Sequence, residues 1–388
     1  MKRVLVRAPL LSQSGYGVHS RQVFKWLLSR KDVTISTHVL NWGNTSWMVN
    51  AEMEGGLIGE IMKRSGKPDD KGFDISFQVQ LPDEWDPSLA KFNVGISAFV
   101  ETDTCNPGWL EACEKMDCII VPTEHIKKTI ERTGKVTKPI YVVSETFPDE
   151  MLEPDVKPFP LEIDTDFNFL IVGQFTGNDP WNDRKNIFLT LKWLCEAFSG
   201  DKDVGIILKT NHGRGTRIDR QITSKIVRDI VSEVRHGEFP KVHLVHGNLE
   251  TKEVAGLYKN PAVKSLVSLT RGEGFGLPLL EASVMELPVI ATNWSGHLDF
   301  LNKGKFIPID YSLIEIPDSR IDNRIFFKGM KWANPNESDF KKKVLKFRYN
   351  YEKPKSWAQN LSKILRESLS QAEVNNHYDN VLMSELGT

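Results

Sequence analysis

Cysteine and long apolar runs are both scarce in this sequence. Only four of its 388 residues are cysteine, and none has the paired C-x-x-C spacing or the companion histidine of a metal site. We therefore expect neither disulfides nor structural zinc, but reduced and mostly buried thiols. The apolar run after Met1 is too short and too interrupted for a signal peptide, and no uncharged run is long enough to span a membrane. These absences predict a cytoplasmic protein.

A strong net charge of either sign is also absent. Fifty Lys and Arg residues stand against 51 Asp and Glu residues, which gives a formal net charge of −1. This balance provides no overall field that would attract nucleic acid or a membrane. Apolar residues make up 40% of the chain and charged residues 26%, as in soluble globular proteins, and the length predicts roughly two or three domains.

The stretch from Arg271 to Phe300 is the most informative part of the chain. An apolar, β-leaning run over 263–269 precedes it, and a Gly-rich loop then leads to Pro278 and a helical pattern. This order predicts a strand, a tight loop and a helix that starts at the proline. The unpaired N–H groups and the positive dipole end of such a helix favour an anion, so the loop is a predicted phosphate site.

Two carboxylates bracket this loop, Glu273 before it and Glu281 one turn into the helix. Carboxylates accept hydrogen bonds from paired hydroxyls, such as those of ribose or a hexose. A ligand with a sugar at each end and phosphate between them, a nucleotide sugar, suits this arrangement. An acidic helix cap after a core strand explains either glutamate alone, but not both.

The run from Glu273 to Glu281 resembles the E-x7-E signature of retaining glycosyltransferases with the two-Rossmann-domain (GT-B) fold, especially family four. Leu287–His297 resembles that family's next strand and loop. The resemblance implies an α/β fold of two Rossmann-like domains with a deep cleft between them. It implies metal-independent transfer from a UDP-, GDP- or ADP-linked sugar, without a cofactor. It also implies a catalytic role for Glu273 and donor binding by Gly274, Phe275, Gly276, Leu277 and Glu281.

Strand-like runs alternate with helical patterns on both sides of a proline-rich segment at 154–160. The alternation predicts mostly parallel sheets flanked by helices, and the prolines predict a linker. We expect an acceptor domain over 1–155 and a nucleotide-sugar domain over 165–350. From the resemblance we expect residues 351–388 to form a helix that crosses back to the first domain.

A basic pair, Arg184 and Lys185, stands at the start of a helix predicted over 186–198. Positive residues oppose the dipole at a helix N-terminus, so a bound anion would offset their placement. With Asn186, the pair matches the diphosphate-binding loop of the resembled family, which implies catalytic roles for both. Some relatives place the arginine earlier, where this chain has Gln174. The alternative is an exposed basic pair without a ligand.

Two further loops follow strands of the first predicted domain. Gly15, Tyr16 and Gly17 end a polar loop after the first strand, and the resemblance implies that they face the donor phosphate; a tight turn without a ligand explains them equally well. Glu101 and Asp103 are candidates for a metal-binding pair, for acceptor binding or a catalytic base, and for capping of a helix near Pro107. The histidine that many relatives carry in this region is missing.

The segment from Arg324 to Arg366 holds twelve Lys and Arg residues against three acids. A solvated surface explains this excess, and so does a polyanionic acceptor. The candidates are a phosphorylated glycan, an anionic membrane surface, or DNA with hydroxymethylated bases presented outside the stack. The acceptor is therefore expected to be a glycan or DNA.

Two other functions are compatible with the same fold. One is a non-catalytic module that binds nucleotide sugars, because fold alone does not establish chemistry. The other is a sugar-nucleotide epimerase or a sugar phosphorylase. The two glutamates together with the basic pair argue against the first, and no motif for a lysine-linked cofactor favours a phosphorylase.

Overall fold

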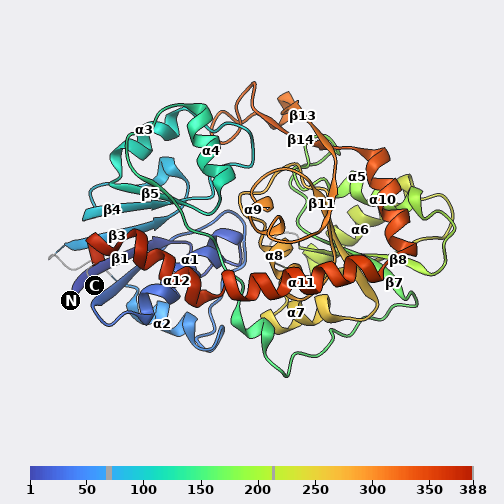
Figure 1. Ribbon diagram of the computed structural model, residues 1–388, viewed down its shortest axis with the longest axis horizontal. Helices are drawn as coiled ribbons and strands as arrows, with labels where there is room; N and C mark the ends of the chain where they lie inside the picture. Colours follow the sequence, from blue (N-terminus) through green and yellow to red (C-terminus); the bar gives the residue numbers. More distant parts are fainter. Residues whose placement is uncertain (67–71, 212–214, 387–388) are drawn as a thin grey trace. The chain divides into compact units, whose positions relative to one another are not determined.

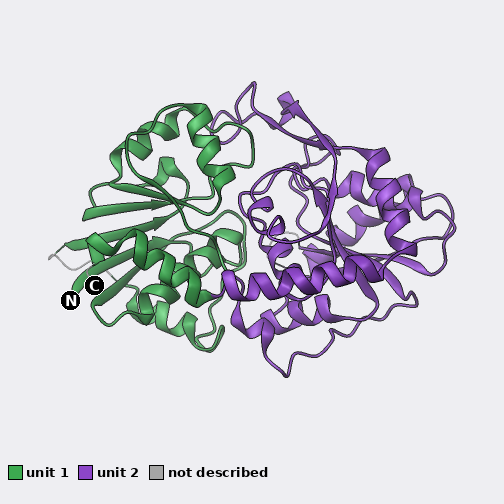
Figure 2. Cartoon of the chain, in the orientation of Figure 1, with its two compact units in different colours: residues 1–146, 371–388 green, residues 147–370 purple. Residues whose placement is uncertain are grey.

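The computed structural model describes residues 1–66, 72–211 and 215–386, which form two compact units (Figure 2). Unit 1 comprises residues 1–146 and 371–388, and unit 2 comprises residues 147–370. The predicted linker at 154–160 lies inside unit 2. The chain enters unit 2 earlier because Phe147 and Met151 are buried in the core of that unit.

Unit 1 is built on a six-stranded parallel sheet with the order β2-β1-β3-β4-β5-β6 (Figure 1). Its middle strands are apolar on both faces because helices cover both sides of a parallel sheet. The winding direction reverses between β1 and β3, which is where ligands gather in doubly wound folds. The elements are β1 (Lys2–Ala8), α1 (Gly15–Ser29), β2 (Val33–Val39), α2 (Leu57–Arg64), β3 (Phe73–Val79), β4 (Ala90–Ile96), α3 (Gly108–Lys115), β5 (Cys118–Val121), α4 (Glu124–Thr133) and β6 (Ile140–Val142).

Unit 2 repeats this architecture with the sheet order β12-β11-β10-β7-β8-β9. Its winding reverses between β7 and β10, and a separate antiparallel pair, β13 with β14, follows in the chain. The elements are β7 (Phe167–Val172), α5 (Ile187–Ala197), β8 (Val204–Thr210), α6 (Arg217–Val234), β9 (Lys241–His246), α7 (Thr251–Lys259), β10 (Val263–Ser268), α8 (Leu277–Val284), β11 (Val289–Thr292), α9 (Leu298–Leu301), β12 (Ile307–Ile309), β13 (Tyr311–Glu315), β14 (Lys331–Pro335), α10 (Glu337–Tyr349) and α11 (Glu352–Ser368). The predicted α/β fold of two Rossmann-like units is confirmed.

The C-terminal segment differs from the single returning helix that the sequence predicted. Helix α11 belongs to unit 2, where Leu361 and Leu365 are buried and Ser362 Oγ donates to Val284 O at 2.7 Å. Only the next helices, α12 (Gln371–Val381) and α13 (Met383–Leu386), join unit 1. There Tyr378 of α12 stacks on Trp26 of α1, with ring centroids 4.6 Å apart. The apolar stripe of α11 is therefore used inside unit 2.

All four cysteines are buried and free. Burial raises the pKa of each thiol, to about 11 or 12. Within the described ranges, no helix has the length and apolar character that a membrane span requires.

Candidate functional site

The loops that follow β7 and β10 meet at the winding reversal of unit 2. Between β10 and α8 the chain turns at Gly276, whose φ of +100° lies in the left-handed region that glycine adopts readily. A Cβ there would stand 3.1 Å from His297 Cβ, so the position is also crowded. Helix α8 begins at Leu277, and Pro278 is its second residue where the sequence predicted the first. The predicted strand, loop and helix are all present.

Glu273 and Lys185 form a close ion pair across these two loops. Lys185 Nζ lies 2.7 Å from both carboxylate oxygens of Glu273, although the residues are 88 positions apart. Arg184 Nη1 lies 3.9 Å from Glu273 Oε2 and donates to Gly272 O at 2.8 Å. Burial alone would raise the pKa of Glu273, but the charges of Lys185 and Arg184 outweigh it and hold that pKa below its usual value. The carboxylate is therefore ionised and faces two cations.

A third loop, after β11, supports the backbone of Glu273. The Glu273 N–H donates to Ser295 Oγ at 2.9 Å, and Gly296 N donates to Glu273 O at 2.9 Å. His297 is fully buried, and its Nε2 lies 2.7 Å from the Thr292 carbonyl, to which it donates. A Cβ on Gly296 would lie 2.1 Å from Gly274 O, so the two loops pack without room for a side chain. This loop is part of the stretch that resembles family four.

Arg271 supports the site, although no pattern in the sequence predicts a role for it. Its side chain is fully buried and donates to Asn334 Oδ1 at 2.9 Å and to Pro180 O at 3.2 Å. Its backbone N–H also donates to Arg184 O at 2.8 Å. Burial lowers the pKa of Arg271 to about 10. Arg271 therefore joins the loop after β10 to β14 and to the loop after β7. The feature of the sequence that could have indicated this role is a charged residue soon after an apolar strand.

Asp183 supplies a negative charge at the N-terminus of α5. This buried acid accepts the Ile187 N–H with Oδ2 at 2.7 Å, and its Oδ1 accepts the Thr176 N–H at 3.0 Å. A negative side chain, which stabilises the positive dipole end of a helix, is thus present beside the basic pair. The hypothesis that Arg184 and Lys185 oppose an uncompensated dipole was wrong. Their case as anion ligands depends instead on their position beside Glu273.

Glu281 has a tyrosine partner from another helix of unit 2. Tyr258, a buried residue of α7, donates its hydroxyl to Glu281 Oε2 at 3.3 Å. Burial raises the pKa of Glu281 to about 7, an effect that the Tyr258 hydrogen bond partly offsets. Glu273 and Glu281 therefore have opposite electrostatic environments, one held ionised and the other close to half protonated at neutral pH.

The raised pKa of Glu281 predicts how the stability of the protein depends on pH. The ordinary pKa of a glutamate carboxyl is 4.5, and that of Glu281 in the folded chain is about 7. Between these values the folded chain keeps a proton that the unfolded chain releases, so the contribution of Glu281 to stability falls as pH rises. Glu281→Gln should therefore melt at a higher temperature than wild type at pH 8, and this gain should shrink as pH falls toward the ordinary pKa of 4.5. Thermal melts from pH 5 to 8, without nucleotide, measure it.

Glu233→Gln, on the exposed face of α6, is the control for this series and should show no such pH trend. Tyr258→Phe removes the hydrogen bond that lowers the pKa of Glu281. In that variant the loss of stability on ionisation of Glu281 should therefore extend to higher pH. A gain for Glu281→Gln of equal size at every pH would contradict the assignment.

The remaining predicted donor-binding residues contact the loop in different ways. Phe275 turns into the core of unit 2, with its ring centroid 5.2 Å from that of Phe300. Only its backbone is thus available to a ligand. Gly274 and Gly276 are buried, and Leu277 is half-buried at the first position of α8.

In unit 1 the predicted loop becomes the first turn of α1. Ser14 caps that helix by accepting the Gly17 N–H at 3.0 Å, and a Cβ on Gly17 would lie 2.0 Å from Ser12 O. The Tyr16 hydroxyl lies 2.9 Å from Ser97 Oγ, and its ring stacks on Trp42 at 4.2 Å. These contacts give Gly17 and Tyr16 structural roles, whereas Gly15 is exposed.

Glu101 and Asp103 lie between β4 and α3, half-buried. At the start of α3, the Gly108 N–H donates to the side chain of Asn106 at 2.8 Å. Among the described residues, no group of three or more His, Cys, Asp and Glu side chains is placed to hold a metal ion.

The basic segment at 324–366 is partly neutralised by distant acids. Lys341 lies 2.5 Å from Glu196 of α5, and Arg348 lies 3.8 Å from Asp203. Acids inside the segment take further cations, as in the 2.7 Å pair of Lys343 with Asp339. The local charge excess in the sequence therefore overstates the charge that α10 presents to a polyanion.

Comparisons with known proteins agree with this architecture. Residues 232–363, which include the Arg271–Phe300 stretch, match a family model described as Glycosyl transferases group 1. No curated protein sequence matches the chain significantly.

Solved structures match at low sequence identity. The sucrose-phosphate synthase of Thermosynechococcus elongatus is 11% identical, with 99% of each chain covered and a TM-score of 0.64. An E. coli protein described as "Trehalose-6-phosphate" with bound UDP-2-fluoro glucose is 10% identical, with 100% of this chain and 99% of that chain covered and a TM-score of 0.62. S. aureus TarM is 15% identical with a TM-score of 0.53; the match covers 81% of this chain but only 55% of TarM. These matches show the GT-B fold, and with the family model they support a glycosyltransferase.

Proposed function

We propose that this chain is a retaining glycosyltransferase that moves a sugar from a nucleotide-sugar donor to a hydroxyl acceptor without a metal. The main support for this proposal is the cluster of Lys185, Arg184 and Glu273 at the winding reversal of unit 2. Doubly wound sheets bind ligands at this point, and the matched family segment contains Glu273.

In this proposal the donor diphosphate binds between the basic pair and the start of α8. A lysine ammonium has three N–H donors, so Lys185 retains one for phosphate after its two contacts with Glu273. The first N–H groups of α8 provide further donors, because they precede the hydrogen-bond ladder of the helix. Glu273 would then hold hydroxyls of the transferring sugar, and Glu281 those of the ribose.

Transfer with retention exchanges one bond at the anomeric carbon for another. The bond from that carbon to the diphosphate oxygen breaks, and a bond to the acceptor oxygen forms on the same face. The leaving diphosphate takes the proton of the incoming hydroxyl. Lys185, Arg184 and the α8 N–H groups stabilise the charge that develops on the diphosphate, and this kind of stabilisation is usually the largest contribution to catalysis.

A thermal-shift panel of UDP-, GDP- and ADP-linked sugars tests donor binding. A ligand that binds the folded state alone stabilises it by about 2.7 kcal/mol at 100 times its Kd, which raises Tm measurably. UDP or a UDP sugar is bound in three of the matched structures, so we expect the largest shift with a UDP sugar. If no nucleotide sugar shifts Tm, the proposed donor site is incorrect.

Chelation tests the proposed independence of metal. Activity should persist in EDTA, because side chains and backbone N–H groups neutralise the diphosphate. Loss of activity in EDTA, with recovery in manganese, would instead favour Glu101 and Asp103 as metal ligands.

The acceptor is proposed to be a glycan. The pneumococcal O-GlcNAc transferase GtfA, whose structure contains UDP and GlcNAc, is 14% identical to this chain, which spans 57% of its length. Hydroxymethylated DNA is a weaker alternative, because acids pair with several of the α10 cations. Duplex DNA binding at low salt that weakens when Lys341, Lys342 and Lys343 become glutamine would favour DNA.

A further inference from the structure

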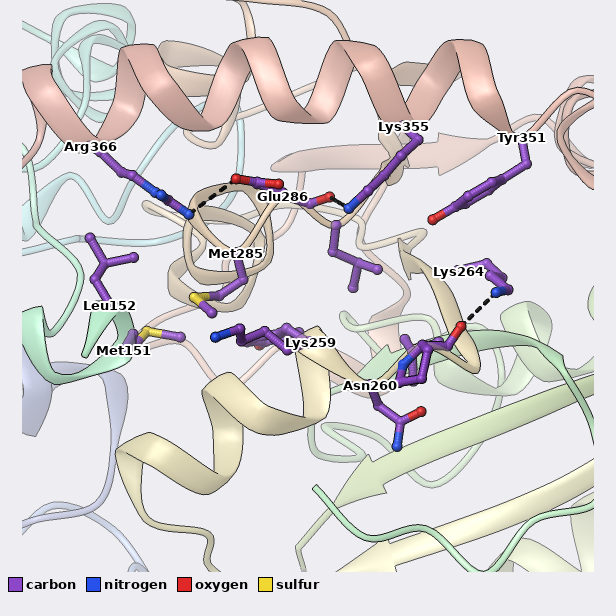
Figure 3. Close-up of a pocket in the computed structure, with 14 residues that line it drawn as sticks. Met151, Leu152, Lys259, Asn260, Lys264, Met285, Glu286, Tyr351, Lys355 and Arg366 are labelled. Carbon is purple, nitrogen blue, oxygen red and sulfur yellow. Dashed lines mark hydrogen bonds and ion pairs between the residues drawn. The ribbon is translucent and has the colours of Figure 1, made fainter. Parts of the chain in front are cut away.

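Unit 2 contains a second site candidate at the opposite edge of its sheet. A cavity of about 610 Å³ is lined by Asn260, which precedes β10, by Val263, the first residue of β10, and by Leu287, just before β11. The cavity lies beneath α11 (Figure 3). Glu273 follows the other end of β10. The cavity therefore lies away from Glu273, although it shares with the proposed donor site the residue Tyr258, which lines the cavity and donates to Glu281. Its size is that of a small-molecule pocket.

Four basic side chains line this cavity, from three elements of the unit. Lys259 ends α7, Lys264 lies in β10, and Lys355 and Arg366 project from α11 (Figure 3). Of the described residues that line the cavity, Glu286 is the one carboxylate. The lining thus carries four positive charges against one negative charge.

The hydrogen bonds of these cations leave most of that charge uncompensated. All four donate to main-chain carbonyls, and Arg366 alone also approaches Glu286, at 3.5 Å. Each lysine has three N–H donors and uses one of them on the protein. The carbonyl contacts are Lys259 with Val156 at 3.2 Å, Lys264 with Pro261 at 2.5 Å, Lys355 with Glu286 at 2.7 Å, and Arg366 with Val284 at 2.8 Å.

Stabilisation of a helix end explains only two of the four basic side chains that line the cavity. Lys355 and Arg366 lie on carbonyls at the C-terminal end of α8, where cations stabilise the helix. Lys259 and Lys264 contact carbonyls of other segments, outside helix ends of that kind. Burial also lowers the pKa of Lys355, which an anion in the cavity would counteract.

The rest of the lining is apolar or aromatic. Met151, Leu152 and Met285 face the cavity on the side opposite Tyr351 (Figure 3). Lys264 Nζ lies 5.6 Å from the centroid of the Tyr351 ring. A ligand that fits both the basic and the apolar parts of the lining carries a compact anionic group and a less polar organic group.

We propose that this cavity binds a phosphate-bearing small molecule, with the lysines and Arg366 on the phosphate and the methionine and leucine side chains on its organic part. Phosphate has several acceptor oxygens, which match the spare N–H donors, and charge-assisted hydrogen bonds of this type are the strong ones.

Equilibrium dialysis of the full chain at low salt, with inorganic phosphate and with phenyl phosphate, tests the proposal. Phenyl phosphate should bind more tightly than inorganic phosphate, phenol should not bind measurably, and added salt should weaken binding. Lys259→Gln/Lys264→Gln should lower the affinity for phenyl phosphate by roughly tenfold or more. These measurements use the Lys185→Gln background, because the proposed donor site also binds phosphate and this substitution weakens binding there.

Two further variants make the result unambiguous. Lys342→Gln/Lys346→Gln removes the same charge from positions of α10 that do not line the cavity and should change the affinity by less than about twofold, because salt screens charges at a distance. Glu286→Gln removes the opposing carboxylate and should tighten binding, an outcome that misfolding cannot produce. Equal losses in both double-lysine variants, or unchanged affinity in Lys259→Gln/Lys264→Gln, would overturn the proposal.

Discussion

Lys185→Ala is expected to lower turnover by about 100-fold or more, the scale seen when a donor that stabilises developing charge is removed. In the proposed mechanism this ammonium contacts the diphosphate as it leaves. Steady-state kinetics with the donor found by the thermal-shift panel measures the effect. Lys192→Ala, on the exposed side of α5, removes a lysine that lies 3.3 Å from Glu196 and should keep wild-type turnover.

The same substitution leaves the buried Glu273 carboxylate with Arg184 as its nearest charge, at 3.9 Å. Stability should fall, though by less than the roughly 3–5 kcal/mol that breaking a fully buried pair costs, because Arg184 remains. Lys185→Ala/Glu273→Gln removes the stranded charge and should regain much of the lost Tm without regaining activity. If the double variant recovers both, Lys185 has only a structural role.

Glu273→Gln and Glu281→Gln are expected to separate turnover from nucleotide binding. Glu273→Gln should chiefly lower kcat, because this carboxylate is proposed to hold the transferring sugar. Glu281→Gln should chiefly weaken nucleotide binding, because it is proposed to hold the ribose. Loss of one charged hydrogen bond costs about 1.5–3 kcal/mol, which is roughly 10- to 150-fold.

Calorimetric titration of the free nucleotide and kinetics of the nucleotide sugar measure the two effects separately. Glu233→Gln is again the control and should match wild type in both. Wild-type affinity and rate in both variants would refute the site assignment. A pure loss of nucleotide affinity in Glu273→Gln would exchange the two roles.

The thermal and binding experiments are linked at Glu281. A carboxyl whose pKa is raised to about 7 costs stability when it is ionised, so its substitution should stabilise the free protein above neutral pH and weaken nucleotide binding. Such opposite effects are common at functional sites, where binding groups are held in unfavourable surroundings. A purely structural glutamate would not show both.

Local patterns in the sequence determined the secondary structure and the class of fold. Apolar runs alternating with helical periodicity predicted both parallel sheets. Turn chemistry predicted the tight loop before α8, because glycine at a left-handed position and a proline in the first turn act within a few residues. The spacing of Glu273 and Glu281 was readable for the same reason.

Contacts between distant segments were decided by the tertiary structure alone. The sheet order brings β7 beside β10, and this places Lys185 against Glu273 across 88 positions. The same packing gives Glu281 its tyrosine partner, pairs α10 with acids outside its own segment, and keeps α11 in unit 2. Charge and periodicity in a sequence are properties of neighbours along the chain. Electrostatic environment depends on neighbours in space, which long-range strand order and helix packing determine.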